Sequence, residues 1–212
     1  MSSPLRRAAP DEVPSVFELY RQRIHWMNRQ GIRQWNVTEY LSVYPLSYYA
    51  SCCTAGTLYV WQEAAAPITG SVVLLTQDSR WDDGETAATC YIHNLVTAPG
   101  CPGTGRRMLA AAERLAVSRG QRSMRLDCAE DNERLKQYYA AQGYRAAGRC
   151  REGNYRGILW EKTAAVRIAP QSKRPERDLL TGFSPVFFRR GVPRFVILPE
   201  ALRLPPEPPS NC

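Results

Sequence analysis

The sequence lacks long apolar runs and is poor in histidine, and both absences exclude classes of protein. No stretch approaches the roughly twenty consecutive apolar residues that a membrane-spanning helix needs. The first residues, Met1 to Arg7, also lack the apolar core of a signal peptide. Only two histidines occur, and together with the cysteines and carboxylates they show no metal-ligand spacing. We therefore expect no membrane segment and no metal site.

Cysteine is present, but not in the patterns that form disulfides or bind zinc. The chain has seven cysteines, an odd number, without any Cys-x-x-Cys pair. Several lie within predicted strands, where a free cysteine behaves as a small apolar residue. Because disulfides are rare in a reducing compartment, this usage predicts a cytoplasmic location.

Lysine is scarce, with three residues against 25 arginines, and the charge balance is only moderately basic. The formal net charge is +8. Residues 166–212 contain eight Arg or Lys and four Asp or Glu, so this segment carries +4 and the rest of the chain carries the other +4. An excess of this size suits an anionic cofactor but does not by itself indicate nucleic-acid binding. We expect no nucleic-acid partner.

The proline distribution divides the chain. Residues 166–212 hold nine of the sixteen prolines and show no clear helical or strand period. We therefore predict a folded domain over residues 1–165 and a Pro/Arg-rich C-terminal tail over residues 166–212 that is largely disordered. An alternative is that the apolar segments of this tail dock on the domain or on a partner, which would make a basic RNA- or partner-binding protein.

The hydrophobic periods within the domain predict the element order β-αα-βββ-α-β-α-ββ. Three strands in a row followed by alternation favour a mixed sheet in an α+β layer over a doubly wound sheet. The dinucleotide-binding alternative is disfavoured because Met108 stands where the third glycine of its fingerprint would be, although Asp127 lies near the distance of its acidic residue. The strands are expected near residues 5–8, 57–62, 68–76, 90–97, 124–128, 145–150 and 155–162.

A glycine-rich turn joins the predicted strand 90–97 to an amphipathic helix. Gly103 and Gly105 stand at the start of this helix, where unpaired backbone N–H groups and the positive end of the helix dipole favour an anion. Arg106 and Arg107 add charge that pairs well with phosphate oxygens. A Gly-x-Gly also occurs in ordinary tight turns for steric reasons, so the turn alone does not decide the ligand. The apolar stripe of the helix is formed by Met108, Leu109, Ala112, Leu115 and Ala116.

A second motif follows the next strand. Asn132 is a suitable N-cap, Tyr139 comes seven residues later, and Gly143-Tyr144 closes the helix. With the glycine turn, this spacing resembles the Gcn5-related N-acetyltransferase (GNAT) superfamily, specifically from Tyr91 to Tyr144. The resemblance implies the acyl-CoA N-acyltransferase fold of that superfamily, with a mixed central sheet of about six to seven strands flanked by helices.

The resemblance also implies acetyl-CoA as co-substrate and a set of residues that contact it. In this family the strand before the turn pairs with the pantetheine arm, and the pyrophosphate sits over the turn. Two positions depart from the pattern: Gly100 replaces a Gln or Arg, and Pro102 cannot donate an N–H to phosphate. The implied cofactor contacts are Leu95, Val96, Thr97, Gly100, Gly103, Thr104, Gly105, Arg106, Arg107 and Asn132.

Direct attack of a primary amine within a ternary complex is the reaction that the resemblance implies. Tyr139 is the expected general acid, since a neutral phenol can protonate the departing thiolate, while Tyr138 is expected to fill the helix face. His93 is the candidate base, with Asp127 and Glu130 as weaker candidates. Strand alternation would place His93 with Tyr91 and Leu95 on one face, and Asn94 with Ile92 and Val96 on the other.

The acceptor remains open between a small-molecule and a peptide or protein amine, and a homodimer is left open as well. A non-catalytic acyl-CoA-binding or regulatory module is the alternative function, motivated by the altered turn. An acidic loop containing Asp82, Asp83 and Glu85 is expected to be solvated. A set of aromatic residues could form a cage for a cationic amine, or could pack in the core and over the site. Its members are Trp26, Trp35, Tyr40, Tyr44, Tyr48 and Tyr49.

Overall fold

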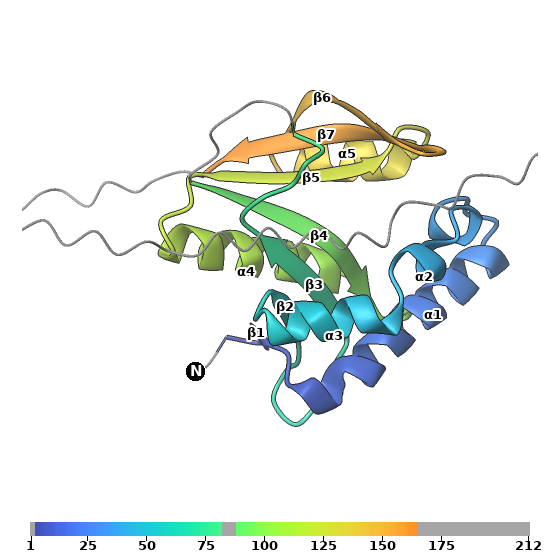
Figure 1. Ribbon diagram of the computed structural model, residues 1–212, viewed down its shortest axis with the longest axis vertical. Helices are drawn as coiled ribbons and strands as arrows, with labels where there is room; N and C mark the ends of the chain where they lie inside the picture. The colour runs from blue at the N-terminus through green and yellow to red at the C-terminus, as the bar shows by residue number, and fades with distance from the viewer. Residues whose placement is uncertain (1–2, 82–87, 165–212) are drawn as a thin grey trace, which may run out of the picture. The chain divides into compact units, whose positions relative to one another are not determined.

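A computed structural model describes residues 3–81 and 88–164 (Figure 1). The predicted tail over residues 166–212 and the acidic residues Asp82, Asp83 and Glu85 lie outside the described residues. The helical elements are η1 (Pro10–Glu12), α1 (Val13–Arg29), η2 (Trp35–Val37), α2 (Tyr40–Val43), α3 (Leu46–Thr54), α4 (Thr104–Ser118) and α5 (Glu133–Ala141). The strands are β1 (Leu5–Arg7), β2 (Leu58–Trp61), β3 (Gly70–Leu75), β4 (Thr89–Thr97), β5 (Ser123–Ala129), β6 (Arg145–Glu152) and β7 (Tyr155–Thr163).

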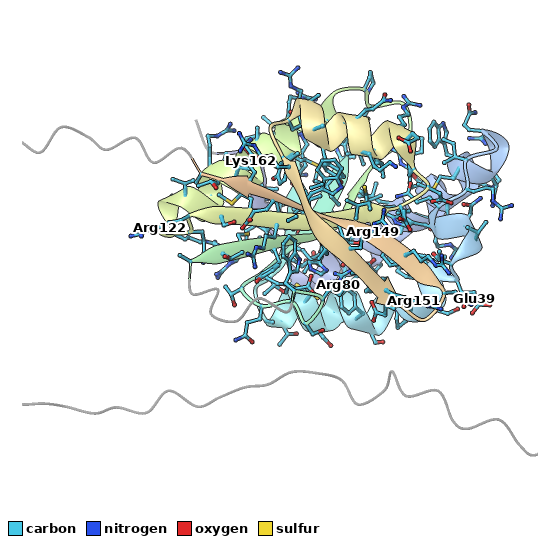
Figure 2. All side chains as sticks on the ribbon, turned by 90° about the horizontal axis from the view of Figure 1, so that it is seen from above. Glu39, Arg80, Arg122, Arg149, Arg151 and Lys162 are labelled. Atoms are coloured by element: carbon cyan, nitrogen blue, oxygen red, sulfur yellow. The ribbon has the colours of Figure 1, made fainter. Side chains whose placement is uncertain are left out.

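The seven strands form one mixed sheet in the order β1-β2-β3-β4-β5-β7-β6. Strands β4 and β5 pair in parallel, and their neighbours pair antiparallel. The predicted element order and the predicted α+β fold with a mixed sheet are therefore confirmed. Strand β6 forms an exposed edge, and Figure 2 shows Arg149 and Arg151 along it. Positive charges on an edge strand discourage pairing with a further strand.

Helices cover the sheet in two layers (Figure 1). On one face, α4 and α5 bury an apolar cluster that includes Met108, Leu109 and Leu126. On the other face, α1 and α3 bury a second cluster around Tyr20 and Tyr49, both with no exposed surface. Three short helices, η2, α2 and α3, replace the predicted irregular helix over residues 35–49, and the proline at position 45 accounts for the break between α2 and α3.

Strands β4 and β5 separate after a short stretch of pairing. Their last paired residues are Tyr91 and Arg125, although β4 continues to Thr97 and β5 to Ala129. Figure 1 shows the two strands diverging beyond this point. We call this separation the β4–β5 split. It opens at the carboxyl end of β4, next to the glycine turn.

A bulge in β4 overturns the predicted alternation of side chains. Val73 pairs with His93 and Ser71 with Val96, so three steps along β4 match two along β3. The extra residue shifts every following side chain to the opposite face. His93 therefore lies opposite Val73 of the α1–α3 cluster, whereas Leu95 packs on the α4 side. The prediction that His93 and Leu95 share one face was wrong, because a bulge is not visible in a period-two pattern.

The bulge also explains on which face of the sheet the Asn94 side chain lies. This residue adopts a left-handed backbone conformation, with φ of +50°. Its side chain bonds to tyrosines of the α1–α3 layer, while Ile92 packs on the α4 side. The prediction that Asn94 shares a face with Ile92 was therefore also wrong.

Gly70 offers a test of how tightly α4 packs on the sheet. A Cβ at this position would lie 2.2 Å from Sδ of Met108, which has no exposed surface, and 3.1 Å from the backbone oxygen of Val96. We expect Gly70→Ala to lower the free energy of unfolding by about 1–3 kcal/mol, because overpacking forces the core to shift. Urea denaturation measures this change.

Gly148→Ala is the matched control for that test. Its added Cβ would meet Cδ1 of Leu159 at 3.6 Å, which is ordinary contact. We expect its free energy of unfolding to stay within about 0.5 kcal/mol of the parent value. Equal stability of the two variants would contradict the predicted packing of α4.

Candidate active site

The glycine turn forms an uncapped helix N-terminus beside the β4–β5 split. Gly100 and Gly103 have φ of +85° and +77°, a region that residues with a side chain rarely adopt. Gly103 is the N-cap of α4, and no side chain caps this end of the helix. Since an uncapped N-terminus attracts anions, the turn is suited to phosphate, as the sequence predicts.

The predicted cofactor residues on β4 and α4 come together around Gly105. A Cβ on Gly105 would lie 3.8 Å from Cγ2 of Thr97 and 4.0 Å from Cδ2 of Leu95. It would lie 3.7 Å from the Tyr138 hydroxyl. Tyr138, which the sequence interpretation treats as apolar filling, therefore brings a polar group to the N-terminus of α4. Burial raises the pKa of Tyr138, so the phenol stays neutral at neutral pH.

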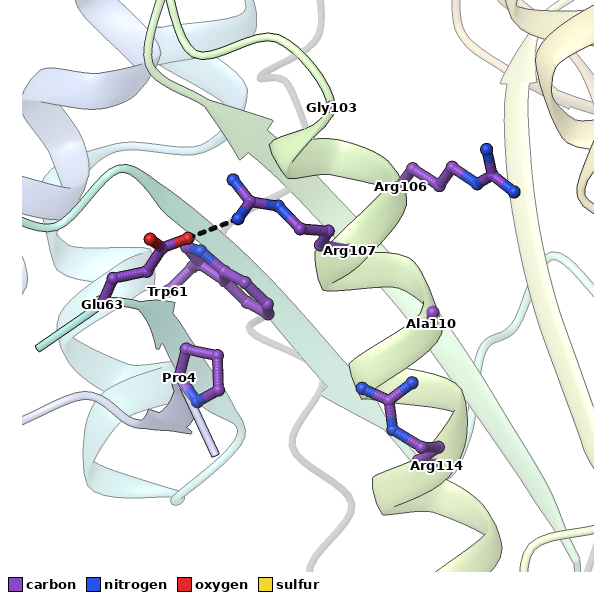
Figure 3. Close-up of a pocket in the computed structure, with 8 residues that line it drawn as sticks. All are labelled: Pro4, Trp61, Glu63, Gly103, Arg106, Arg107, Ala110 and Arg114. Carbon is purple, nitrogen blue, oxygen red and sulfur yellow. Dashed lines mark hydrogen bonds and ion pairs between the residues drawn. The ribbon is translucent and has the colours of Figure 1, made fainter. Parts of the chain in front are cut away.

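Arg106 and Arg107 point to different sides of α4 (Figure 3). Arg107 pairs with Glu63 at 2.6 Å and lies 5.6 Å from the ring centre of Trp61. Arg106 points away from this pair, as Figure 3 shows, and its charge acts on Tyr138. The two arginines thus do not form one phosphate clamp. An open hollow of about 690 Å³ on this flank is lined by Pro4, Trp61, Glu63, Gly103, Arg106, Arg107, Ala110 and Arg114.

Asn132 caps α5 as predicted. Its Oδ1 accepts a hydrogen bond from the backbone N–H of Leu135 at 3.0 Å. Its Nδ2 donates to Oε1 of Gln34 at 3.2 Å, which ties α5 to the segment before η2. The side-chain amide therefore already has an internal partner for each of its two functional atoms.

Tyr139 lies on the inner side of α5. Its ring centre is 6.0 Å from that of Tyr144 and 6.5 Å from that of Trp160 on β7. Burial raises the pKa of Tyr139, and the nearby Cys128 on β5 adds to the effect. The phenol therefore stays neutral at neutral pH, and it lies next to β5, one of the two strands that border the split.

A polar cluster lies on the α1–α3 face of the split; we call its members, Asp78, Arg80, His93, Asp127 and Tyr155, the Arg80 cluster. Arg80 Nη1 lies 2.9 Å from Oδ1 of Asp127, and its Nε lies 3.1 Å from Oδ1 of Asp78. Nε2 of His93 lies 3.0 Å from Oδ2 of Asp78. Tyr155 donates its hydroxyl to Oδ2 of Asp127 at 2.5 Å. Arg80 thereby bridges β4 and β5 beyond their last paired residues.

The hydrogen bonds within the Arg80 cluster show which ring nitrogen of His93, the candidate base, carries the proton. Nη2 of Arg80 lies 2.7 Å from Nδ1 of His93, so both ring nitrogens are engaged inside the protein. The carboxylate of Asp78 can only accept, which assigns the ring proton to Nε2. With a neutral imidazole, two carboxylates and one guanidinium leave the cluster with one net negative charge.

Most of this cluster was not predicted from the sequence. Asp78, Arg80 and Tyr155 were not candidates, and Asp127 was a weaker candidate base. Their closest signal in the sequence is an Asp-x-Arg directly after the buried strand 70–75. Only the folded arrangement shows that this short segment reaches across to β5.

The aromatic group acts mainly as packing. Ring centres of Trp35 and Tyr40 lie 4.6 Å apart, and those of Tyr48 and Tyr49 lie 5.1 Å apart. Tyr40 is 6% exposed and Tyr49 is fully covered, so these two rings cannot line a cage for a free amine. For these two rings, the structure shows the packing alternative.

Over residues 3–81 and 88–164, no three His, Cys, Asp or Glu side chains are grouped closely enough to hold a metal ion. None of the helices in those ranges has both the length and the apolar character to cross a membrane.

The buried carboxylate of Asp78 predicts an acid-sensitive fold. Burial alone would raise the pKa of this carboxyl, but the hydrogen bonds from His93 and Arg80 and the positive charge of Arg80 outweigh it, and the pKa lies well below its usual range. A lowered folded pKa adds stability that is complete above the unfolded pKa near 4 and is lost as pH falls below it. Urea unfolding between about pH 3 and 6 should show this loss, and Asp78→Asn should be less stable at pH 6 with a flatter pH dependence. If the free energy of unfolding of Asp78→Asn depended on pH as steeply as that of the parent, the lowered pKa of Asp78 would be contradicted.

Comparisons with known proteins agree with this geometry. A family model described as the acetyltransferase (GNAT) family matches residues 24–144. A comparison with curated proteins finds no match. Among solved structures, a GNAT-family acetyltransferase from Listeria monocytogenes 4b F2365 is 23% identical, with 76% of this chain and 94% of that chain covered and a TM-score of 0.63.

Two similar structures carry the coenzyme. The PaiA N-acetyltransferase from Thermoplasma acidophilum, in complex with coenzyme A, is 15% identical over 77% of this chain and 100% of that chain, with a TM-score of 0.59. The yncA structure from Salmonella typhimurium, with its cofactor acetyl-CoA, is 16% identical over 81% of this chain and 99% of that chain, with a TM-score of 0.55. These likenesses support the same fold. Because the family model covers more than half of the sequence and the sheet and glycine turn fit it, this chain belongs to the GNAT acetyltransferase family.

Proposed function

We propose that this protein is an acetyl-CoA-dependent N-acetyltransferase that moves an acetyl group to a primary amine by direct attack in a ternary complex. The observation that carries the proposal is the β4–β5 split, which ends at an uncapped helix N-terminus. The split exposes strand edges to an extended arm, and the helix end favours the anionic part of the same molecule. Family membership and the coenzyme-bound relatives support this assignment.

The cofactor contacts follow from this placement. The pantetheine arm would run along Leu95, Val96 and Thr97, and the pyrophosphate would lie over residues 100–105. Gly100, Gly103, Thr104 and Gly105 supply the turn, and Arg106 supplies charge on the side of Tyr138. Arg107 contributes only if it leaves Glu63, and Asn132 contributes through its capping position.

The chemistry requires two proton transfers. The amine nitrogen bonds to the thioester carbon, the carbon–sulfur bond breaks, and Tyr139 protonates the departing thiolate. Before the attack, His93 accepts a proton from the substrate ammonium at Nδ1, which leaves the neutral amine as nucleophile, and Asp78 stabilises the resulting imidazolium through Nε2. For this step Arg80 must first move away from Nδ1 of His93.

The acceptor is a small-molecule or peptide amine that reaches the split from the face of the Arg80 cluster. The net negative charge of that cluster favours a cationic group there. Cytoplasmic location and a homodimer stay predictions.

A non-catalytic acyl-CoA-binding module is the second candidate. Pro102 removes one N–H from the turn, and both nitrogens of His93 are already occupied. Acetyl-CoA binding without amine-dependent thiol release would favour this candidate.

Tyr139→Phe tests the proposed acid. Removing the hydroxyl should lower kcat about 100-fold, because general acid catalysis typically contributes 10²–10⁴-fold. The Kd for acetyl-CoA should stay within about threefold, since the ring still packs against Trp160. Thiol release across a panel of amines gives kcat, and calorimetry gives Kd.

Tyr138→Phe is the neighbouring control. Its hydroxyl lies at the N-terminus of α4, so its loss should raise the Kd for acetyl-CoA more than it lowers kcat. A 100-fold loss of kcat in Tyr138→Phe with normal turnover by Tyr139→Phe would assign the acid role to Tyr138 instead.

A further inference from the structure

Asn94, at the bulge of β4, is held by tyrosines from three successive helices. Tyr20 of α1 donates its hydroxyl to the Asn94 carbonyl at 2.5 Å. Tyr48 of α3 donates to Oδ1 at 3.0 Å, and Nδ2 donates to the hydroxyl of Tyr40 of α2 at 2.5 Å. All three polar groups of Asn94 that face this layer are therefore bonded.

The tyrosine layer that holds Asn94 is itself rigid. The ring centre of Tyr20 lies 4.6 Å from that of Tyr49 and 5.7 Å from that of Tyr40. Tyr20 is fully covered and Tyr40 is 6% exposed. A buried phenol needs a hydrogen-bond partner, and the Asn94 carbonyl serves Tyr20 in this way. Tyr20 and Tyr40 are therefore held in place when they bond to Asn94.

The tyrosine bonds help to stabilise the bulge. Asn94 has φ of +50°, and a non-glycine residue in this region costs about 1–2 kcal/mol. Neither Asn94 nor Leu95 pairs in register with β3. The tyrosine bonds offset this cost and keep β4 from sliding back into a regular ladder.

The bulge lies where the proposed reaction would take place. It begins three residues after Tyr91, the last residue of β4 that pairs with β5, and ends before Thr97 beside the turn. Leu95, its second residue, packs on the cofactor side, while His93 belongs to the Arg80 cluster on the acceptor side. A bulge leaves its extra residue outside the ladder, so a main-chain N–H remains for another acceptor.

We propose that Asn94 is a positioning residue: Tyr20, Tyr40 and Tyr48 lock it and thereby fix the bulge, so that a main-chain N–H of β4, the donor that family membership implies, is held toward the carbonyl oxygen of the bound thioester. The inference rests on the proposed function. As charge develops on that oxygen during attack, a fixed donor stabilises it more than a mobile one. Helices α1 to α3 thereby affect the transfer step without contacting the acetyl group.

Three substitutions isolate the Asn94 side chain. Asn94→Gly keeps the positive φ at no steric cost but removes both side-chain bonds. Asn94→Asp keeps the acceptor for Tyr48, and the Tyr40 hydroxyl can turn to donate to the second oxygen. Tyr49→Phe removes a buried hydroxyl from the same stack, whose bond is to Tyr40 at 3.4 Å, and serves as the matched control.

The readouts are kcat at saturating acetyl-CoA, the Kd for acetyl-CoA, and the infrared carbonyl band of bound [1-¹³C]acetyl-CoA. For Asn94→Gly we expect kcat to fall about 10- to 100-fold, Kd to change less than about threefold, and the shift of the carbonyl band on binding to shrink. Asn94→Asp should restore most of kcat and of the band shift. Tyr49→Phe should keep both at the parent values.

The infrared carbonyl band distinguishes a failure of this inference from a failure of the proposed function. A kcat and a band shift in Asn94→Gly equal to those of the parent, while amines are acetylated, would overturn the inference alone. Equal losses in Asn94→Gly and Tyr49→Phe would also overturn it, because they would show a general effect of core packing. A band shift that Asn94→Gly loses, in a protein that acetylates no amine, would uphold the inference and reject the transferase.

Discussion

The separation of β4 from β5 is the constraint on which the site depends. The two strands pair only up to Tyr91 and Arg125, and the backbone beyond that point must find other partners. The glycine turn and the N-terminus of α4 lie on one side of the resulting split, and the Arg80 cluster lies on the other. A cofactor and an acceptor can therefore approach the same point from opposite faces of one sheet.

Each border of the split is held by a different kind of interaction. The cofactor side depends on close packing, in which Met108 of α4 lies directly over Gly70 of β3. The acceptor side depends on buried charge, in which Arg80 joins His93 of β4 to Asp127 of β5. Between the two, Asn94 is fixed by neutral hydrogen bonds from tyrosines. Packing, charge and hydrogen bonding thus meet within a few residues of one strand.

The fold and the local features on the α4 side of the sheet could be predicted from the sequence, because both depend on local patterns. Glycines at a helix start, the stripe through Met108 and the cap at Asn132 act within a few residues of each other, and the structure reproduces them. The acceptor side depends on long-range contacts: Arg80 meets Asp127 only after the sheet has formed. The bulge at Asn94 reversed the predicted faces for the same reason, since its partners lie 46 and 54 residues away along the chain.

Amide hydrogen exchange with and without acetyl-CoA tests the central claim that the split is the cofactor site. The account predicts slower exchange on binding for the amides from Leu95 to Arg106, together with α5 around Tyr138. It predicts no change around Trp61 and Glu63, which border the hollow on the other flank of α4. Slower exchange around Trp61 and Glu63, with unchanged exchange from Leu95 to Arg106, would contradict this claim.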